Sequence, residues 1–202
     1  MQLSLYIIAT LAAASAAFRV PEGATDGVYA AYYDESGNEV HVKDPNPIIV
    51  AVLVSAAPEA RAVKKPGVSR ARRASAPSEL FARAATVWCG CGFHLNNIDC
   101  DGAVQQIKDG INGAGGQSDV GPGLAWYAIR GNVVVFLCNR YGPGRGRVTV
   151  SSFAAGLSTI TSACGYYVTG TIENGVLDIG YMNNDSNVWF CERSRWSTVH
   201  EC

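Results

Sequence analysis

The chain has 202 residues, a formal net charge of −1 and a hydrophobic content of 48%. These values suit one domain or two small ones and argue against disorder for the chain as a whole. After Arg73 the sequence carries eight basic and ten acidic residues, a net charge of −2. No basic footprint therefore points to a nucleic-acid partner or to an anionic membrane surface.

The first residues predict a secretory signal peptide over residues 1–17. Leu3 to Ala14 is mostly apolar, and Ser15-Ala16-Ala17 places small residues where a signal peptidase reads the chain. The alternative is a membrane anchor, but the apolar run is shorter than the ~20 residues of a spanning helix. We therefore expect a secreted, extracellular protein without stable membrane insertion.

Residues 18–73 are interpreted as a pro-segment. Gly27 to Tyr33 is β-prone, Asp34 to Asn38 has turn chemistry, and Glu39 to Val42 alternates, a pattern that predicts a hairpin. Ile48 to Val54, IIVAVLV, is short enough to be a buried strand rather than a helix. We hypothesise that this segment packs on the folding domain and is later removed. The alternative is a solubility or transit segment with no specific docking.

A linker rich in Ala, Ser, Pro and Arg follows, with two dibasic pairs that a processing protease of the secretory pathway would cut: Lys64-Lys65 and Arg72-Arg73. Arg70 adds a basic residue before the second pair, which makes it the better site. Extended, exposed segments are what such proteases need, although a solvated charged linker would look similar. We expect cleavage after Arg73, a short linker over 74–87 and a cysteine-rich domain over 88–202.

That domain alternates helix and strand signals. One predicted helix covers Gly102 to Ile111, with Asp99 or Asp101 as its cap. A second is capped by Ser151 and ended by Gly165, with apolar residues spaced for one face: Phe153, Leu157, Ile160 and Cys164.

Strands are predicted over 88–94, 124–129, 133–138, 147–150, 166–172, 176–182 and 188–191. Gly131 and Asn174-Gly175 supply the turns of two hairpins. This order predicts an α+β fold, in which an antiparallel sheet carries two helices packed on one face.

All seven cysteines follow the dibasic pairs: Cys89, Cys91, Cys100, Cys138, Cys164, Cys191 and Cys202. Their position predicts a disulfide framework made in an oxidising compartment, with bridges that staple helices to sheet. Because seven is odd, at most three bridges form within the chain. The remaining thiol is free, capped or paired with a second chain in a disulfide-linked dimer, and the connectivity stays open.

The search for catalytic chemistry finds no convincing site. Cys89 and Cys91 are too close in sequence for a usual zinc knuckle and are better read as half-cystines than as nucleophiles activated by His94. Asp99 and Asp101 are more simply helix caps than paired catalytic carboxylates, and Glu173 is a turn residue. We expect no catalytic residue, no metal and no cofactor.

One loop combines arginine, glycine and tyrosine in YGPGRGRV and its preceding residue. Such loops bind phosphate or acidic surfaces, although a solvated hairpin loop is the simpler interpretation. Its candidate binding residues are Arg140, Tyr141, Arg145 and Arg147.

A glycosylation sequon begins at Asn184 and reads Asn184-Asp185-Ser186.

The combined pattern resembles the small secreted cysteine-rich proteins of filamentous fungi. The resemblance lies in VPEGATDGVYAAYYDESGNEVH, then a kexin-type dibasic cut, then a domain with NVVVFLCN and ITSACGYYVTGTI. It implies an effector that acts on a plant host or a toxin aimed at competing microbes. The order of helices and strands is also similar to that of killer-toxin-like α/β sandwiches. No catalytic residue carries over from this resemblance.

The leading hypothesis is therefore a secreted, non-enzymatic effector or toxin of a fungus, matured by dibasic cleavage. A secreted hydrolase or ribonuclease-like enzyme is one alternative, which the scarcity of histidines and paired acids disfavours. A cell-wall carbohydrate-binding protein with exposed Trp or Tyr rings is another. The host or microbial surface target is left open.

Overall fold

The computed structural model describes residues 18–44, 85–139, 144–184, 189–191 and 199–202. The strands are β1 (Phe18–Arg19), β2 (Gly27–Tyr33), β3 (Glu39–Lys43), β4 (Thr86–His94), β5 (Gln117–Val120), β6 (Leu124–Arg130), β7 (Val133–Asn139), β8 (Gly146–Thr149), β9 (Val168–Asn174), β10 (Leu177–Asn183) and β11 (Trp189–Phe190). The helices are α3 (Asn97–Gly113) and α4 (Val150–Cys164).

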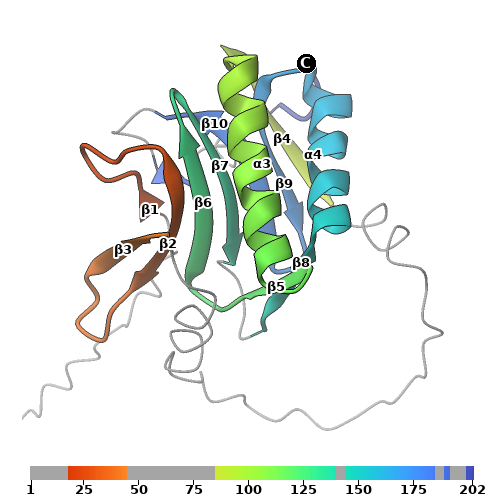
Figure 1. The fold of residues 1–202 in the computed structure, drawn as a ribbon. Coiled ribbons are helices and arrows are strands. Elements are labelled where there is room, and N and C mark those ends of the chain that lie inside the picture. The colour runs from red at the N-terminus through yellow and green to blue at the C-terminus, as the bar shows by residue number, and fades with distance from the viewer. Residues whose placement is uncertain (1–17, 45–84, 140–143, 185–188, 192–198) are drawn as a thin grey trace, which may run out of the picture.

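The fold is mostly antiparallel sheet with two helices, which confirms the α+β class in outline. Seven strands form one sheet in the order β3-β2-β6-β7-β10-β9-β4. Two small pairs, β1 with β11 and β5 with β8, lie apart from it. Helix α3 lies over β6 and β7, and α4 lies over β9, β10 and β4 (Figure 1).

The strongest hairpin predictions are confirmed. Strands β2 and β3 pair antiparallel, as do β6 with β7 and β9 with β10. The last two hairpins turn at Gly131 and Gly175, whose φ angles are +50° and +62°. Glycine reaches this left-handed region without a steric penalty, which is why these two positions mark tight turns.

Helix α3 is longer than predicted and begins with a different cap. It starts at Asn97, and the Asn96 side chain accepts a hydrogen bond from the backbone N–H of Asp99 at 3.1 Å. The expected cap at Asp99 or Asp101 is therefore wrong, because Asn96 satisfies the free amide first. Asp99 instead lies in the first turn, where a negative charge is favourable to the helix dipole.

Helix α4 is also capped earlier than expected, by two residues. Thr149, not Ser151, is the N-cap, and Ser152 completes a reciprocal capping box with it. The predicted stop is confirmed, since Gly165 ends the helix with a φ of +96°. The expected apolar stripe is confirmed as well: Phe153, Leu157, Ile160 and Cys164 are all buried.

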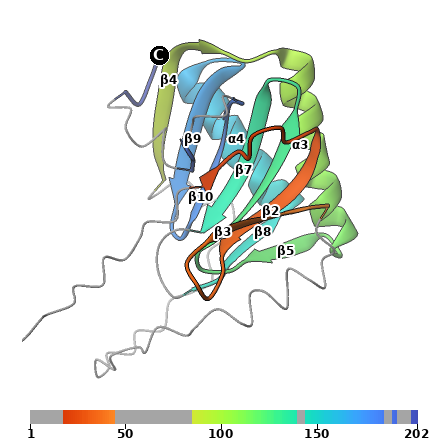
Figure 2. The same cartoon turned by 90° about the vertical axis from the view of Figure 1, so that its left-hand side faces the viewer.

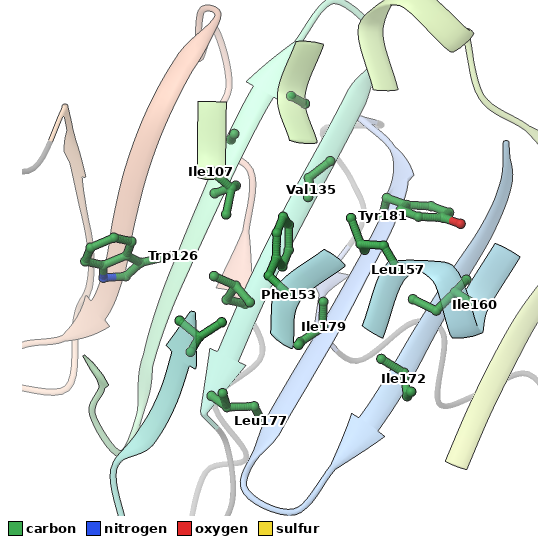
Figure 3. Packing of buried hydrophobic residues seen from close by; sticks show 14 of the residues in the cluster. Ile107, Trp126, Val135, Phe153, Leu157, Ile160, Ile172, Leu177, Ile179 and Tyr181 are labelled. Carbon is green, nitrogen blue, oxygen red and sulfur yellow. The ribbon is translucent and has the colours of Figure 1, made fainter. Parts of the chain in front are cut away.

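The larger core cluster joins both helices to the sheet (Figure 3). Ile107 of α3 and Phe153 of α4 belong to it together with Trp126, Val135 and Ile179 from the strands. Each is nearly or fully shielded from solvent. Burial of this apolar surface is the main force that holds the helices on the sheet.

A second cluster contains no helix residue among its described members. Phe18, Val20, Tyr29 and Ala31 from the N-terminal part pack there with residues of the C-terminal part: Ala125, Tyr127, Ile129, Val134, Phe136, Cys138, Met182, Phe190 and Cys191. The predicted pro-segment therefore contributes directly to a core that it shares with the cysteine-rich part. Ile48 to Val54, predicted as a buried strand, lies outside the described residues.

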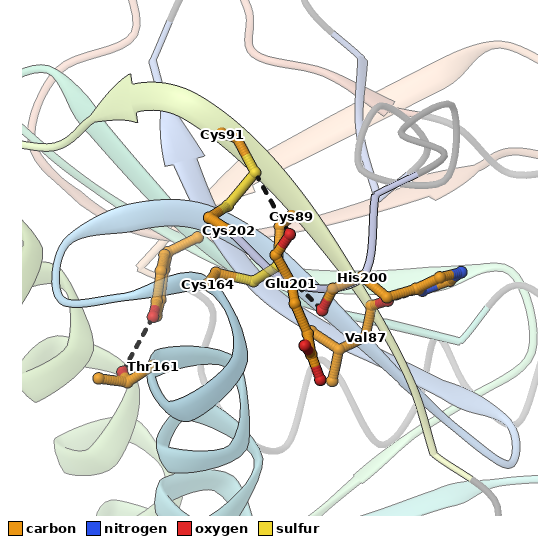
Figure 4. Close-up of a disulfide and its surroundings, with 9 residues drawn as sticks. Val87, Cys89, Cys91, Thr161, Cys164, His200, Glu201 and Cys202 are labelled. Carbon is orange, nitrogen blue, oxygen red and sulfur yellow. Dashed lines mark hydrogen bonds between the residues drawn. A yellow bond between two sulfur atoms is a disulfide. The ribbon is translucent and has the colours of Figure 1, made fainter.

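Three disulfides hold the cysteine-rich part: Cys89–Cys164, Cys91–Cys202 and Cys138–Cys191. The first joins β4 to the end of α4, and the second fastens the chain's last residue to β4 (Figure 4). The backbone supports this, since the Cys89 amide donates to the Val199 carbonyl at 2.9 Å. The bridges confirm the stapled framework.

Several boundaries and two short strands differ from the sequence prediction. Strand β4 starts at Thr86, two residues inside the expected linker, and β8 ends at Thr149 because the next residue opens α4. The predictions missed β1 and β5, which are two and four residues long. Within the described residues, neither helix has the length and apolar character that crossing a membrane requires.

Candidate functional site: the groove between the two helices

A hollow of about 230 Å³ lies between α3 and α4 and is lined by charged, hydroxyl and aromatic side chains. Helix α3 contributes Asp101 and Lys108, and α4 contributes Thr161. Tyr166 and Tyr167, which follow α4, complete one wall together with Tyr181 of β10. The hollow therefore combines two helices, one strand and the segment that follows α4.

Gly165 places the tyrosine pair at the mouth of this groove. The glycine ends α4, and Tyr167 then adopts a positive φ of 56°, uncommon for a residue with a bulky side chain. The Tyr167 hydroxyl donates to Asp101 Oδ2 at 3.2 Å, a bond that raises the pKa of the tyrosine. Tyr166 is 80% exposed, so its ring face is available to a partner.

The floor of the groove carries a second polar contact. The hydroxyls of Tyr181 and Thr161 lie 3.1 Å apart and share a hydrogen bond. Burial raises the pKa of Tyr181, so this hydroxyl stays protonated at physiological pH. The groove thus offers hydroxyls, one carboxylate, one ammonium group and an open aromatic ring, a set suited to hydrogen bonding and stacking rather than to proton transfer.

Cys100 borders the same groove and is the cysteine left without a disulfide in the described structure. It is 4% exposed. Burial raises the pKa of its thiol to about 12, and the neighbouring Asp101 carboxylate adds to the shift. A thiol held in its neutral form is a poor nucleophile.

We expect native Cys100 to react with iodoacetamide at pH 8 roughly 100-fold or more slowly than the same cysteine in urea. The reaction is slow because little of the native thiol is in the reactive thiolate form and because burial keeps the reagent away from it. Mass spectrometry of the alkylated protein over time measures both rates. Similar rates in the folded and the unfolded protein would contradict the burial of this thiol.

The raised pKa of Cys100 also makes the free energy of unfolding depend on pH. The unfolded thiol loses its proton near pH 8.5, whereas the native thiol keeps it up to about pH 12. The contribution of Cys100 is therefore complete below about pH 8.5 and is lost as the pH rises toward 12. Comparison of the wild type with Cys100→Ala across this range isolates the contribution.

A second hollow, of about 500 Å³, lies beside α3 at the start of β2. Gln106 and Trp126 line it from the cysteine-rich part, and Val28 and Asp44 line it from the N-terminal part. The buried Nε1 of Trp126 and Oε1 of Gln106 have no hydrogen-bond partner among the described residues. This hollow shows again that the two parts of the chain build common surfaces.

The structure describes only part of the arginine loop, so its role as a binding site stays a prediction. Arg140 and Tyr141 lie outside the described residues. Arg147 Nε is 3.1 Å from Asp119 Oδ1 and forms an exposed ion pair that joins β8 to β5. Arg145 is exposed. In the described part of the loop, one of the two arginines is therefore already engaged within the fold.

The residues considered for catalysis form disulfides or hydrogen bonds within the fold, or lie in a strand. Cys89 and Cys91 form disulfides with different partners, as the half-cystine interpretation predicts. Asp99 Oδ2 accepts a hydrogen bond from the Asn132 amide at 3.3 Å, and Asp101 accepts one from Tyr167. Glu173 lies in β9 rather than in the turn.

The structure describes only one residue of the predicted modification sites, Asn184. The dibasic residues Lys64, Lys65, Arg72 and Arg73 lie outside the described residues, and cleavage there remains a prediction. Asn184 follows β10, and its amide donates to the Asn132 carbonyl at 2.9 Å. The other two sequon positions are not described, so glycosylation also remains a prediction.

The sequence did not predict the groove between the helices (the tyrosine groove), because Tyr166, Tyr167 and Tyr181 were all assigned to strands. The available signal was the pair Tyr166-Tyr167 directly after a helix-ending glycine. Among the described residues, no group of three or more His, Cys, Asp or Glu side chains is arranged to hold a metal ion. No protein-family model, curated protein or solved structure matches this chain.

Proposed function

We propose that the chain is the precursor of a secreted, non-enzymatic effector or toxin of fungal type. It is matured by dibasic cleavage after Arg73 and acts on host plant cells or competing microbes by binding a surface target. The sequence supplies the secretion and processing signals and the resemblance to fungal cysteine-rich proteins. The structure adds support through the disulfide framework.

The distribution of the three disulfides carries this proposal. All six bridged cysteines lie after the dibasic pairs, and the bridges join residues 53 to 111 positions apart. Bridges that close long loops stabilise a small domain outside the cell, where no reducing pool protects free thiols. A protein built to persist in a hostile extracellular space needs this kind of framework.

We further propose that both helices cover the same face of the sheet, as in a two-layer sandwich. Ile107 of α3 and Phe153 of α4 belong to one core cluster, which supports this arrangement. The groove between the helices then opens on the outer side of the helical layer. We propose it as the surface that meets the target.

The carbohydrate-binding alternative gains one specific observation. Tyr166 is exposed beside a groove that also presents hydroxyl and carboxylate groups. Aromatic rings with adjacent hydrogen-bonding groups are suited to sugar rings, which have apolar faces and hydroxyl edges. Cell-wall binding is therefore kept as the second candidate for the same groove.

The test uses the full chain secreted from a yeast host. The matched control carries alanine at all four dibasic positions: Lys64, Lys65, Arg72 and Arg73. Both proteins are applied to leaf tissue and to fungal and bacterial cultures, in oxidised and reduced form. We expect cell death, immune suppression or growth inhibition only from the cleaved, oxidised protein. Inactivity combined with retention on chitin or glucan would favour the wall-binding candidate, and catalytic turnover would contradict both.

A further inference from the structure

Residues 18–44 precede both dibasic pairs, yet they complete the main sheet of the cysteine-rich part. Strand β2 pairs antiparallel with β6 from Gly27 opposite Ile129 to Ala31 opposite Ala125. Strand β3 then forms the outer edge beyond β2. Figure 2 shows the two orange strands continuing the sheet next to β6. Without β2, the backbone of β6 would become an unpaired edge.

Side-chain contacts join the two parts in addition to the backbone pairing. Phe18 is fully buried, and its ring centroid lies 6.0 Å from that of Phe190. Strand β1 also pairs with β11, which places the Arg19 guanidinium 4.2 Å from the centre of the Trp189 ring. Tyr29 stacks on Tyr127 with 5.0 Å between ring centroids.

Polar contacts also fix the register between the two parts. Asp26 Oδ1 accepts a hydrogen bond from the Gly131 amide at 2.9 Å, in the turn between β6 and β7. The Tyr127 hydroxyl lies 2.7 Å from His41 Nδ1, and His41 Nε2 lies 2.7 Å from Glu39 Oε1. Release of residues 18–44 would break the contacts that Asp26 and His41 make with the rest of the chain.

Removal of residues 18–44 would uncover much of the second core cluster. Tyr127, Ile129, Phe136 and Phe190 are fully buried there, alongside Phe18 and Tyr29. Their exposure would create a contiguous apolar patch of the kind that monomeric secreted proteins rarely present. The cut sites lie between β3 and β4 in the sequence, so cleavage leaves the N-terminal strands β2 and β3 intact.

We propose that dibasic cleavage opens the chain but does not release its N-terminal part. Residues 18–44 stay docked on β6 as a second, non-covalent chain, and the mature protein consists of two chains. Residues 18–73 contain no cysteine, so no disulfide ties the N-terminal chain to the rest. This inference rests on the dibasic processing in the proposed function, and it replaces the expectation of a discarded pro-segment.

The test follows the two chains after cleavage of the full secreted protein. One version is cut by a purified dibasic-specific protease. A second version carries the recognition sequence of an unrelated site-specific protease, inserted between Lys65 and Pro66. Size-exclusion chromatography with mass spectrometry of the peak shows whether both chains elute together. Hydrogen exchange of the β6 amides shows whether β2 still covers them.

We expect both chains in one peak at a 1:1 ratio, with protected β6 amides and separation only in denaturant. A folded C-terminal chain that elutes alone, or as a dimer of itself, would overturn the inference. If the dibasic pairs resist cleavage while the inserted site yields a two-chain complex, the docking holds and the processing step of the proposed function fails.

A variant pair measures the contribution of the docked side chain. Phe18→Ala should raise the Kd of the N-terminal chain roughly 100-fold or more, because a fully buried aromatic ring is lost. Glu22→Ala, an exposed change in the same segment, should leave the Kd unchanged. Equal retention of the two variants after cleavage would show that Phe18 does not hold the chains together.

Discussion

Replacement of Cys89 and Cys164 together by alanine is expected to lower the free energy of unfolding by about 4 kcal/mol. The bridge joins residues 75 positions apart, so its loss restores a large amount of freedom to the unfolded chain. It also connects the outer strand β4 to the end of α4. Since domains of this size are stable by about 5–15 kcal/mol, the double variant should lose between about a quarter and four fifths of its stability.

Urea unfolding followed by circular dichroism measures this loss. Cys100→Ala is the matched control, because Cys100 is equally buried but forms no disulfide. The control removes one sulfur from the core and should cost about 1 kcal/mol. If the double variant lost no more free energy of unfolding than twice the loss of the control, the bridge between β4 and α4 would contribute little.

The sequence was a good guide where the signal is local. The hairpin of β9 and β10 has an Asn-Gly turn between two β-prone runs, and the structure pairs the two strands, with β9 starting and ending two residues later than predicted. The stripe from Phe153 to Cys164 likewise predicted the buried face of α4. In both cases residues that are close in sequence determine the local conformation.

The start of α3 shows why boundaries are harder. The helix was predicted to begin at Gly102, but it begins at Asn97, and Gly102 lies inside it with the Arg130 side chain packed close by. A Cβ at this position would lie 2.2 Å from Arg130 Cδ. The glycine is therefore explained by a residue from a distant strand, which the local pattern cannot reveal.

The candidate site and the shared sheet depend on contacts over still longer distances. Tyr167 and Asp101 are 66 positions apart and meet only because α4 lies beside α3. Strand β2 was predicted, but its pairing with β6 across the dibasic linker was not. The sequence shows that a strand has a partner; it does not show which edge of the sheet provides it.

Phe153→Ala is expected to cost about 3–5 kcal/mol, the range for a buried aromatic ring replaced by alanine. Phe153 is fully buried in the first turn of α4. In Figure 3 its ring points from the helix toward the sheet, between Val135 and Ile179. The neighbouring strands are held in the sheet on both sides, so they cannot collapse into the space that the ring would leave.

Phe93→Ala is the matched control for this prediction, because Phe93 is 59% exposed and should change stability by less than about 0.5 kcal/mol. Urea midpoints of both variants and of the wild type, with equal slopes, give the two differences. Similar losses in the two variants would mean that Phe153 does not anchor α4. A large loss confined to Phe153→Ala would show that burial of this ring is a major contribution to the stability of the fold.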